Sequence, residues 1–171
     1  MKYVLSVLMA LSACSVFSQD HVKFRASIDA AIGLGDDISS GAQTIGNGIT
    51  TVTLGAALKG FSLGVGSGLF KMRGTKSHDY YVPVYGELSY LVQKNKAAPF
   101  FGIKIGKLMP QKDASNPYPF LNKSTMMYNP SVGLAIDAKI LYIMPFLQYL
   151  VPADFDSRFD TFGVGLRVMT R

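Results

Sequence analysis

Apolar and non-apolar residues alternate with a period of two along nearly the whole chain after Gln19. In the last stretch, Phe162, Val164, Leu166 and Val168 alternate with two glycines and Arg167. A period of two is typical of a β-strand whose two faces meet different surroundings. Helical periodicity is absent after the N-terminal segment. The pattern therefore predicts an all-β fold.

Eight such stretches follow one another, separated by segments rich in turn-forming residues. One face of each is apolar and the other is mostly Gly, Ser, Thr and Ala, except that the seventh is apolar on both faces and has no assigned register. Pro83, Pro130 and Pro145 lie inside stretches, and we expect them to mark strand ends or bulges because proline cannot donate to a β-ladder. The stretches are His21–Gly35, Ile49–Lys59, Phe61–Met72, Val82–Gln93, Phe100–Leu108, Tyr128–Ile140, Leu141–Val151 and Phe162–Val168.

Strands of this kind fit a closed barrel that crosses a membrane. A spanning strand needs about 9–11 tilted residues, and every backbone polar group in hydrocarbon must be paired, so the sheet must close. A soluble barrel of lipocalin type would reverse the faces and carry many charges outside. The sequence therefore predicts an eight-stranded antiparallel up-and-down transmembrane β-barrel, with a soluble lipocalin-like carrier as the alternative.

Composition and the N-terminus agree with an exported protein. The chain is 49% hydrophobic and only 16% charged, against about 25% charged in an average soluble domain. Residues 1–18 have a lysine, an apolar run and then small residues, which predicts a cleaved signal peptide before a barrel domain over residues 19–171. The stretch Leu11–Cys14 resembles a lipobox, so lipidation of Cys14, the only cysteine, is the alternative.

An eight-stranded barrel is narrow enough for side chains to fill its interior, and buried charges must pair. Glu87 and Lys104 fall at similar depth on either side of a short turn, so we expect a cross-strand pair. Arg25 and Arg167 lie on the first and last strands, which become neighbours when the barrel closes. Strand alternation predicts a lumen charge network of Arg25, Asp29, Glu87, Lys104, Asp137 and Arg167.

The last strand also matches the pattern polar-x-Gly-x-x-apolar-x-apolar through Thr161, Gly163, Leu166 and Val168. The whole mature chain resembles small outer-membrane β-barrel proteins of Gram-negative bacteria, especially the Bacteroidetes-type barrel family. This resemblance implies a bacterial outer-membrane location, membrane lipid as a partner, and recognition of the last strand by the barrel-assembly machinery. The chain departs from the pattern by ending on Arg171, where many such proteins end on an aromatic residue.

Candidate catalytic groups are few. Some barrels of this size are lipid-modifying enzymes with a Ser–His pair, because serine needs a neighbouring base. Here Ser77, His78 and Asp79 are adjacent in one loop, where side chains rarely converge on one reacting atom. A metal site would need more ligands than the two distant histidines, His21 and His78. No basic cluster interleaves with aromatic residues, as nucleic-acid binding would need. We expect no enzymatic activity, cofactor or nucleic-acid partner.

The sequence thus predicts a non-enzymatic, integral outer-membrane barrel whose lumen is filled by side chains and whose extracellular loops have a structural or binding role. Two alternatives are a porin-like pore for small solutes, which the inward charges argue against, and a lipid-modifying enzyme. If both termini are periplasmic, the long loops face outward. These loops are Asp36–Gly48, Arg73–Tyr81, Gln111–Thr125 and Pro152–Arg158.

Overall fold

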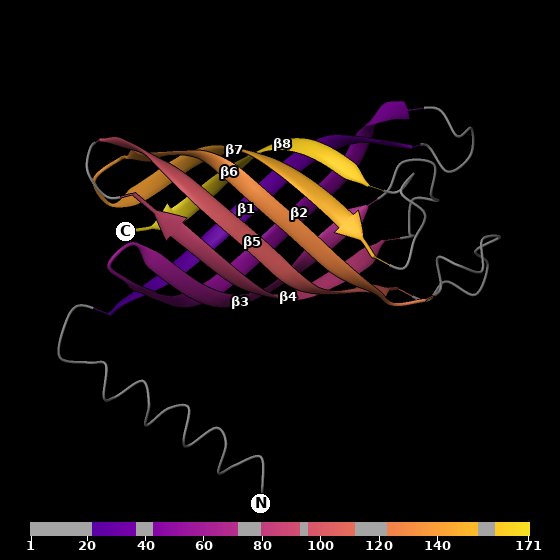
Figure 1. The fold of residues 1–171 in the computed structure, drawn as a ribbon, viewed down its shortest axis with the longest axis horizontal. Coiled ribbons are helices and arrows are strands. Elements are labelled where there is room, and N and C mark those ends of the chain that lie inside the picture. The colour runs from indigo at the N-terminus through magenta and orange to yellow at the C-terminus, as the bar shows by residue number, and fades with distance from the viewer. Residues whose placement is uncertain (1–21, 37–42, 72–79, 93–95, 112–122, 154–159) are drawn as a thin grey trace, which may run out of the picture.

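The computed structural model describes residues 22–36, 43–71, 80–92, 96–111, 123–153 and 160–171. Eight antiparallel strands form one closed barrel in which each strand pairs with its neighbours in the sequence (Figure 1). The predicted eight-stranded, up-and-down architecture is confirmed. The strands are β1 (Lys23–Asp36), β2 (Gln43–Leu58), β3 (Phe61–Lys71), β4 (Tyr81–Leu91), β5 (Ala97–Pro110), β6 (Thr125–Asp137), β7 (Leu141–Pro152) and β8 (Thr161–Thr170).

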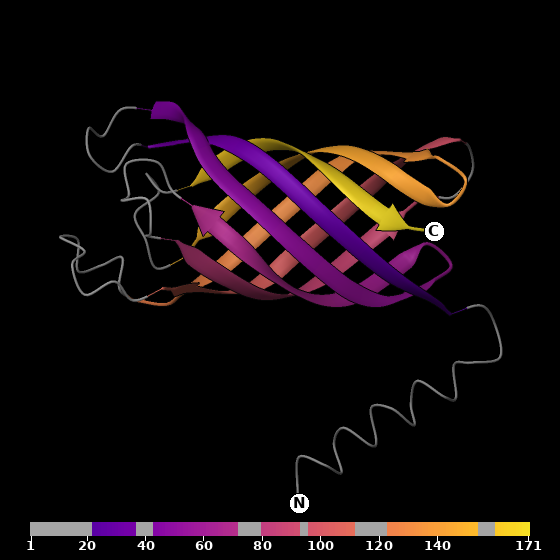
Figure 2. The same cartoon turned by 180° about the vertical axis from the view of Figure 1, so that it is seen from behind.

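The barrel closes through antiparallel pairing of β1 with β8. This ladder runs without a break from Ser27 opposite Met169 to Leu34 opposite Phe162. Figure 2 shows the two strands side by side, with β1 beginning and β8 ending at the same end of the barrel. Closure leaves no edge strand, so every strand has a hydrogen-bonded neighbour on both sides.

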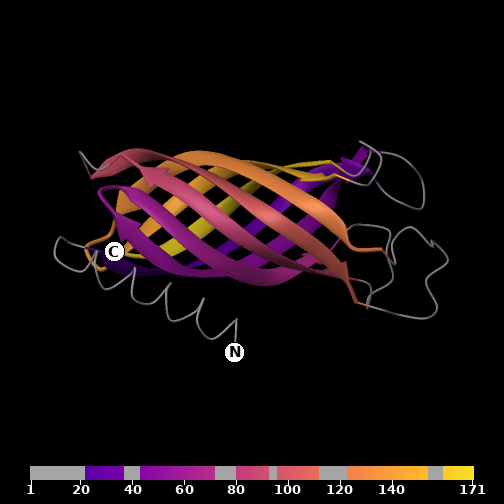
Figure 3. The same ribbon diagram turned by 60° about the horizontal axis from the view of Figure 1, so that its bottom comes forward.

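Short connections lie at the end where β1 begins, which we call the short-turn end (Figures 1 and 3). Lys59 and Gly60 join β2 to β3 with φ values of 48° and 92°, because a two-residue hairpin favours positive φ at both central positions. Lys139 also has a positive φ, 74°, and its backbone N–H donates to Asp137 Oδ1 at 2.8 Å. We call the opposite end the long-connection end.

The first long loop is shorter than predicted. Residues 43–48 belong to β2, and β1 continues to Asp36. The two strands stay paired across a register shift, where Gly33 faces Asn47 but Leu34 faces Ile45. Turn-forming residues in 43–48 suggested a loop, but pairing with β1 satisfies their backbone groups, and a bulge absorbs the extra residue.

The interior prolines lie within strands at gaps in one ladder, and the prediction that they mark strand ends or bulges is wrong. The β3–β4 ladder has no pairs between Ser67–Val84 and Phe70–Tyr81, which is where Pro83 lies. The β6–β7 ladder is broken in the same way beside Pro130 and beside Pro145. The register is unchanged across each gap, and the ladder on each proline's other side is continuous. A missing N–H therefore removes pairing on one side without inserting a residue.

The outer wall of the barrel is apolar on all eight strands. Among outward strand positions whose side chains the structure describes, only Lys71 and Lys107 are charged. In β7, whose register the sequence left open, Ile143 and Leu147 face outward while Met144 and Phe146 face inward. Exposed outward side chains include Ile28, Val52, Leu54, Leu63, Val65, Leu88, Phe101, Ile105, Val132, Leu134, Ile143, Leu147, Val164 and Leu166.

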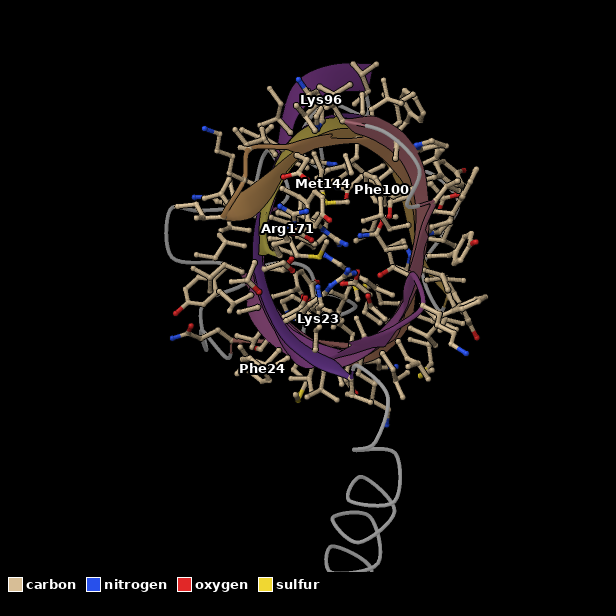
Figure 4. The ribbon with its side chains drawn as sticks, turned by 90° about the vertical axis from the view of Figure 1, so that its left-hand side faces the viewer. Lys23, Phe24, Lys96, Phe100, Met144 and Arg171 are labelled. Atoms are coloured by element: carbon tan, nitrogen blue, oxygen red, sulfur yellow. The ribbon has the colours of Figure 1, made fainter. Side chains whose placement is uncertain are left out.

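The lumen holds more large apolar side chains than the sequence pattern indicated. Toward the long-connection end, five of them form what we call the apolar plug: Phe70, Tyr81, Leu108, Met127 and Leu150, all at most 4% exposed. Figure 4, which looks in from the short-turn end, shows Phe100 and Met144 pointing into the lumen. Residues at strand ends and on the doubly apolar β7 supply most of this interior.

Inward glycines make room for inward aromatic rings. A Cβ added at Gly66 would lie 2.5 Å from the Tyr85 ring, and one added at Gly165 would lie 2.5 Å from Phe146. Each glycine is the register partner of its ring on the neighbouring strand. The glycines in the last strand thus allow close packing inside a narrow barrel.

Candidate functional site: the charged lumen

Four charged side chains meet in the middle of the lumen, and we call them the central charge cluster: Asp29 on β1, Glu87 on β4, Lys104 on β5 and Arg167 on β8. Their exposed fractions are 2–5%. All four side chains point inward from their strands. Barrel closure therefore brings them together, although Asp29 and Arg167 are 138 positions apart in the sequence. The arrangement arises from strand period and closure acting together.

Arg167 is the centre of the cluster. Its Nε and Nη2 donate to the two carboxylate oxygens of Asp29 at 2.8 Å each, in a bidentate pair. Its Nη1 donates to Glu87 Oε1 at 2.5 Å. One guanidinium therefore joins a carboxylate on the neighbouring strand β1 to a carboxylate on β4, across the barrel. The planar fork of arginine suits this double role.

Lys104 spans the lumen in the other direction. Its Nζ donates to Asp29 Oδ2 at 2.5 Å and to Thr51 Oγ1 at 2.8 Å. Because β5 and β1 lie on opposite sides of the barrel, this contact ties two walls together. Two ion pairs, Lys104–Asp29 and Arg167–Glu87, therefore cross the middle of the lumen, the first between β5 and β1 and the second between β8 and β4.

Neutral groups complete the cluster. Thr53 Oγ1 donates to Glu87 Oε2 at 3.2 Å and lies 2.8 Å from the Tyr85 hydroxyl. The ammonium of Lys104 lies 5.0 Å from the centre of the Tyr85 ring, a distance at which an aromatic face attracts a cation. Two cations and two anions thus balance, with hydroxyls and a ring at their sides. Such pairing and hydrogen bonding is what a buried charge requires.

The expected Glu87–Lys104 pair is not formed. The two residues are register partners on β4 and β5, but each reaches across the lumen to a different residue. The first and last strands are neighbours as predicted, and across this closing seam Arg167 faces Asp29. Sequence reasoning identified neighbouring strands, whereas the contacts depend on which side chains meet across a curved interior.

Arg25 lies apart from the central charge cluster, nearer the short-turn end. It is 5% exposed, its Nη1 donates to Ser62 Oγ at 2.7 Å, and its Nε has no hydrogen-bond partner. Among the described residues, no carboxylate lies within ion-pair distance of it. A cavity of about 20 Å³ lies between Arg25, Ser62 and Glu87, with room for about one water molecule.

Asp137 is not a member of the lumen network. It is the last residue of β6, its side chain is 24% exposed, and it pairs with Arg171 at 3.4 Å. Alternation correctly placed it on the inward side, but the strand ends there and the carboxylate reaches the rim. Five of the six predicted lumen charges are therefore buried, and four of them are joined by ion pairs.

The remaining candidate residues are those of the proposed assembly signal in β8, the two histidines and Cys14. Thr161, Gly163, Leu166 and Val168 all lie in β8, the first two facing inward and buried, the last two exposed on the outer wall. His21 and the Ser77–Asp79 stretch lie outside the described residues, as do Cys14 and the signal segment. Among the residues that are described, no three His, Cys, Asp or Glu side chains gather to hold a metal. No helix in the described part of the chain is long and apolar enough to cross a membrane.

Comparisons with known proteins support the fold. No protein-family model matches the chain, and no curated protein matches it. Among solved structures it is similar to Neisserial surface protein A, with a TM-score of 0.65, 10% identity, and coverage of 88% of this chain and 99% of that one. It is also similar to the N-terminal β-barrel domain of OprF from Pseudomonas aeruginosa, with a TM-score of 0.60, 11% identity, and coverage of 88% and 98%.

These likenesses define a class. The chain has the fold of small, eight-stranded outer-membrane β-barrels. At about one identical residue in ten, the similarity concerns the path of the backbone and carries no information about individual side chains.

Proposed function

We propose that the protein is an integral outer-membrane β-barrel without enzymatic activity, whose closed lumen supports connections that have a structural or binding role. The observation that carries this proposal is the outer wall. Large apolar side chains are exposed on every strand, whereas five charged side chains are buried inside: Arg25, Asp29, Glu87, Lys104 and Arg167. A contiguous apolar surface of this extent marks contact with lipid or another protein, and a soluble carrier of lipocalin type would have the opposite arrangement.

The side chains in the lumen favour a closed barrel and argue against a pore for small solutes. Two ion pairs cross its centre, and the apolar plug fills the part toward the long-connection end. The central charges are engaged with one another, and they offer neither an activated nucleophile nor a free base. This favours a supporting role for the barrel and leaves recognition to the connections.

We further propose that residues 1–18 are a signal peptide, that the barrel domain covers residues 19–171, and that the chain belongs with the Bacteroidetes-type barrels. The alternation in β8 supports recognition of Thr161, Gly163, Leu166 and Val168 by the barrel-assembly machinery. Mass spectrometry of the mature protein tests the first point, with a start at Gln19 expected. A lipidated Cys14 would instead make this a lipid-anchored barrel.

Folding in a membrane mimetic tests the main proposal. The purified chain should enter detergent micelles or lipid vesicles and migrate differently on a gel before and after boiling, because a closed barrel resists detergent denaturation. In intact cells, protease should cut within the long connections, such as residues 72–80 or 111–124. A chain that stays monomeric in buffer without detergent would overturn the proposal, and cleavage at residues 94–98 would reverse the orientation.

A further inference from the structure

Every connection at the short-turn end carries a positively charged residue. Lys59 lies in the β2–β3 turn, Lys96 directly before β5, and Lys139 in the β6–β7 turn, while Lys23 begins β1 and Arg171 follows β8 at the closing seam. All five are exposed. Figure 4 shows Lys23, Lys96 and Arg171 at separate positions around the opening. We call these five residues the basic rim.

Little negative charge offsets the basic rim. Asp137 is the acidic residue at this end among those described, and it pairs with Arg171. No carboxylate of the described residues lies within ion-pair distance of Lys23, Lys59, Lys96 or Lys139. By contrast, the segments that connect strands at the opposite end, residues 37–42, 72–80, 111–124 and 153–160, carry six acidic and five basic residues. The positive excess therefore belongs to one end of the barrel.

Exposed apolar side chains accompany the cations of the basic rim. Phe24 follows Lys23 and is 69% exposed, and Ile140 follows Lys139 and is 81% exposed. Beside Lys59, the outward rings of Phe61 and Tyr90 lie 4.5 Å apart. Each of these lysines thus lies at the end of a strand or in a turn, next to an exposed apolar or aromatic side chain of the outer wall. Aromatic and basic side chains arranged in this order are typical of a membrane interface.

We propose that the basic rim binds anionic phospholipid, with phosphodiester headgroups between the lysines and acyl chains against the adjoining apolar wall. The joint presence of cations and exposed apolar groups favours an amphiphile over a soluble acidic polymer, which would need only the charges. The inference rests on the proposed membrane location. With both termini in the periplasm, the lipids would be those of the inner leaflet of the outer membrane. Each lysine near an anionic surface contributes about fivefold in affinity.

The test measures lipid binding to detergent-folded protein by native mass spectrometry. Phosphatidylglycerol and phosphatidylcholine are titrated separately onto the wild type and onto the triple variant Lys59→Gln/Lys96→Gln/Lys139→Gln. The matched control is Lys71→Gln/Lys107→Gln/Lys123→Gln, which removes equal charge from exposed positions toward the other end. A fourth arm adds soluble glycerophosphoglycerol as a headgroup without acyl chains.

The wild type should prefer phosphatidylglycerol, and the rim variant should lose that preference by about tenfold or more while the control variant keeps it. Equal losses in the two variants, or no preference in the wild type, would overturn the proposal. Tight binding of soluble glycerophosphoglycerol would overturn the choice of a lipid. Gel migration of boiled and unboiled samples reports whether each variant is folded. A wild type that folds but shows no lipid preference would contradict this inference alone. A wild type that never folds in detergent would contradict the membrane proposal as well.

Discussion

Arg167 contacts both carboxylates of the central charge cluster, which makes it the residue on which the lumen most depends. Removing its guanidinium leaves Asp29 with Lys104 and a longer hydrogen bond from Thr51, and leaves Glu87 with only the Thr53 hydroxyl. Removing Lys104 instead leaves Asp29 in its bidentate pair with Arg167. Because an unpaired buried charge costs far more than a lost second partner, the two cations are not equivalent.

We therefore expect Arg167→Met to lower the free energy of unfolding by about 3–5 kcal/mol and Lys104→Met by about 1.5–3 kcal/mol. Urea unfolding of the barrel from lipid vesicles measures both. In double-mutant cycles, Glu87→Gln should couple to Arg167→Met more strongly than to Lys104→Met, since only the first pair is in contact. Stronger coupling of Glu87 with Lys104 would restore the cross-strand pair that strand register alone suggested.

Glycine at position 165 is required by close packing and not by backbone conformation, because an added Cβ would lie 2.5 Å from the Phe146 ring and 2.7 Å from both the Ala30 carbonyl oxygen and the Ala31 Cβ. We expect Gly165→Ala to destabilise the barrel by about 1–3 kcal/mol, the usual cost of overpacking, and Phe146→Leu in the same chain to recover part of it. Gly86→Ala is the matched control, because its added Cβ would meet only one atom, at 3.9 Å. Unfolding midpoints in urea compare the three variants, and equal losses at positions 86 and 165 would refute the packing explanation.

At the scale of strands, the eight seams of the barrel are unequal. The β1–β2 ladder is continuous from Lys23 to Gly33, whereas the β6–β7 ladder is interrupted beside Pro130 and again beside Pro145. Buried beside this seam, Asn129 donates to Gln148 at 3.1 Å, but its own Oδ1 has no partner. Fewer ladder bonds and an unsatisfied amide make β6–β7 the weaker seam.

Hydrogen exchange should reveal this difference. We expect backbone amides near the two β6–β7 gaps to exchange faster than amides in the continuous part of the β1–β2 ladder, from Lys23 to Gly33 of β1. The reason is that local opening costs less free energy where ladder hydrogen bonds are missing. Exchange followed by mass spectrometry on the folded barrel in detergent measures it, with the uninterrupted β7–β8 ladder as an internal reference. Uniform protection around the barrel would show that the proline gaps do not weaken it.

At the scale of the whole molecule, two groups of side chains lie across the lumen at different depths, and we expect each to be a barrier to solutes. The central charge cluster lies in the middle, and the apolar plug lies toward the long-connection end. Phe70 and Leu108, at 1% and 0% exposed, belong to that second barrier. A solute would have to displace both in turn, so neither barrier alone decides permeability.

Planar-bilayer conductance can separate the two barriers. We expect the wild type and the Glu87→Ser/Arg167→Ser variant to show no steady pore, because the apolar plug remains. Adding Phe70→Ala and Leu108→Ala should open a steady conductance, provided the barrel still folds by the heat-migration test. A steady pore in the wild type would favour the small-solute pore instead, and one in the double variant would show that the plug is not a barrier.

The alternation of apolar and small residues is enough to predict the eight strands, their outward faces and the inward direction of six charges. This works because a strand has only two faces and a barrel only an inside and an outside. The six inward charged residues can be identified from this alternation without knowing which residues they contact. The same logic failed for β7, where both faces are apolar and nothing in the pattern distinguishes them.

Tertiary structure alone decided which charges meet. Lys104 pairs with Asp29, on the opposite wall, rather than with its register partner Glu87, because the lumen is narrow enough for side chains to reach across it. Pairing with β1 likewise decided that residues 43–48 belong to a strand, and the end of β6 decided that Asp137 lies at the rim. Local pattern determines which way a side chain points, whereas distances across the barrel depend on its curvature and on pairing between strands far apart in the chain.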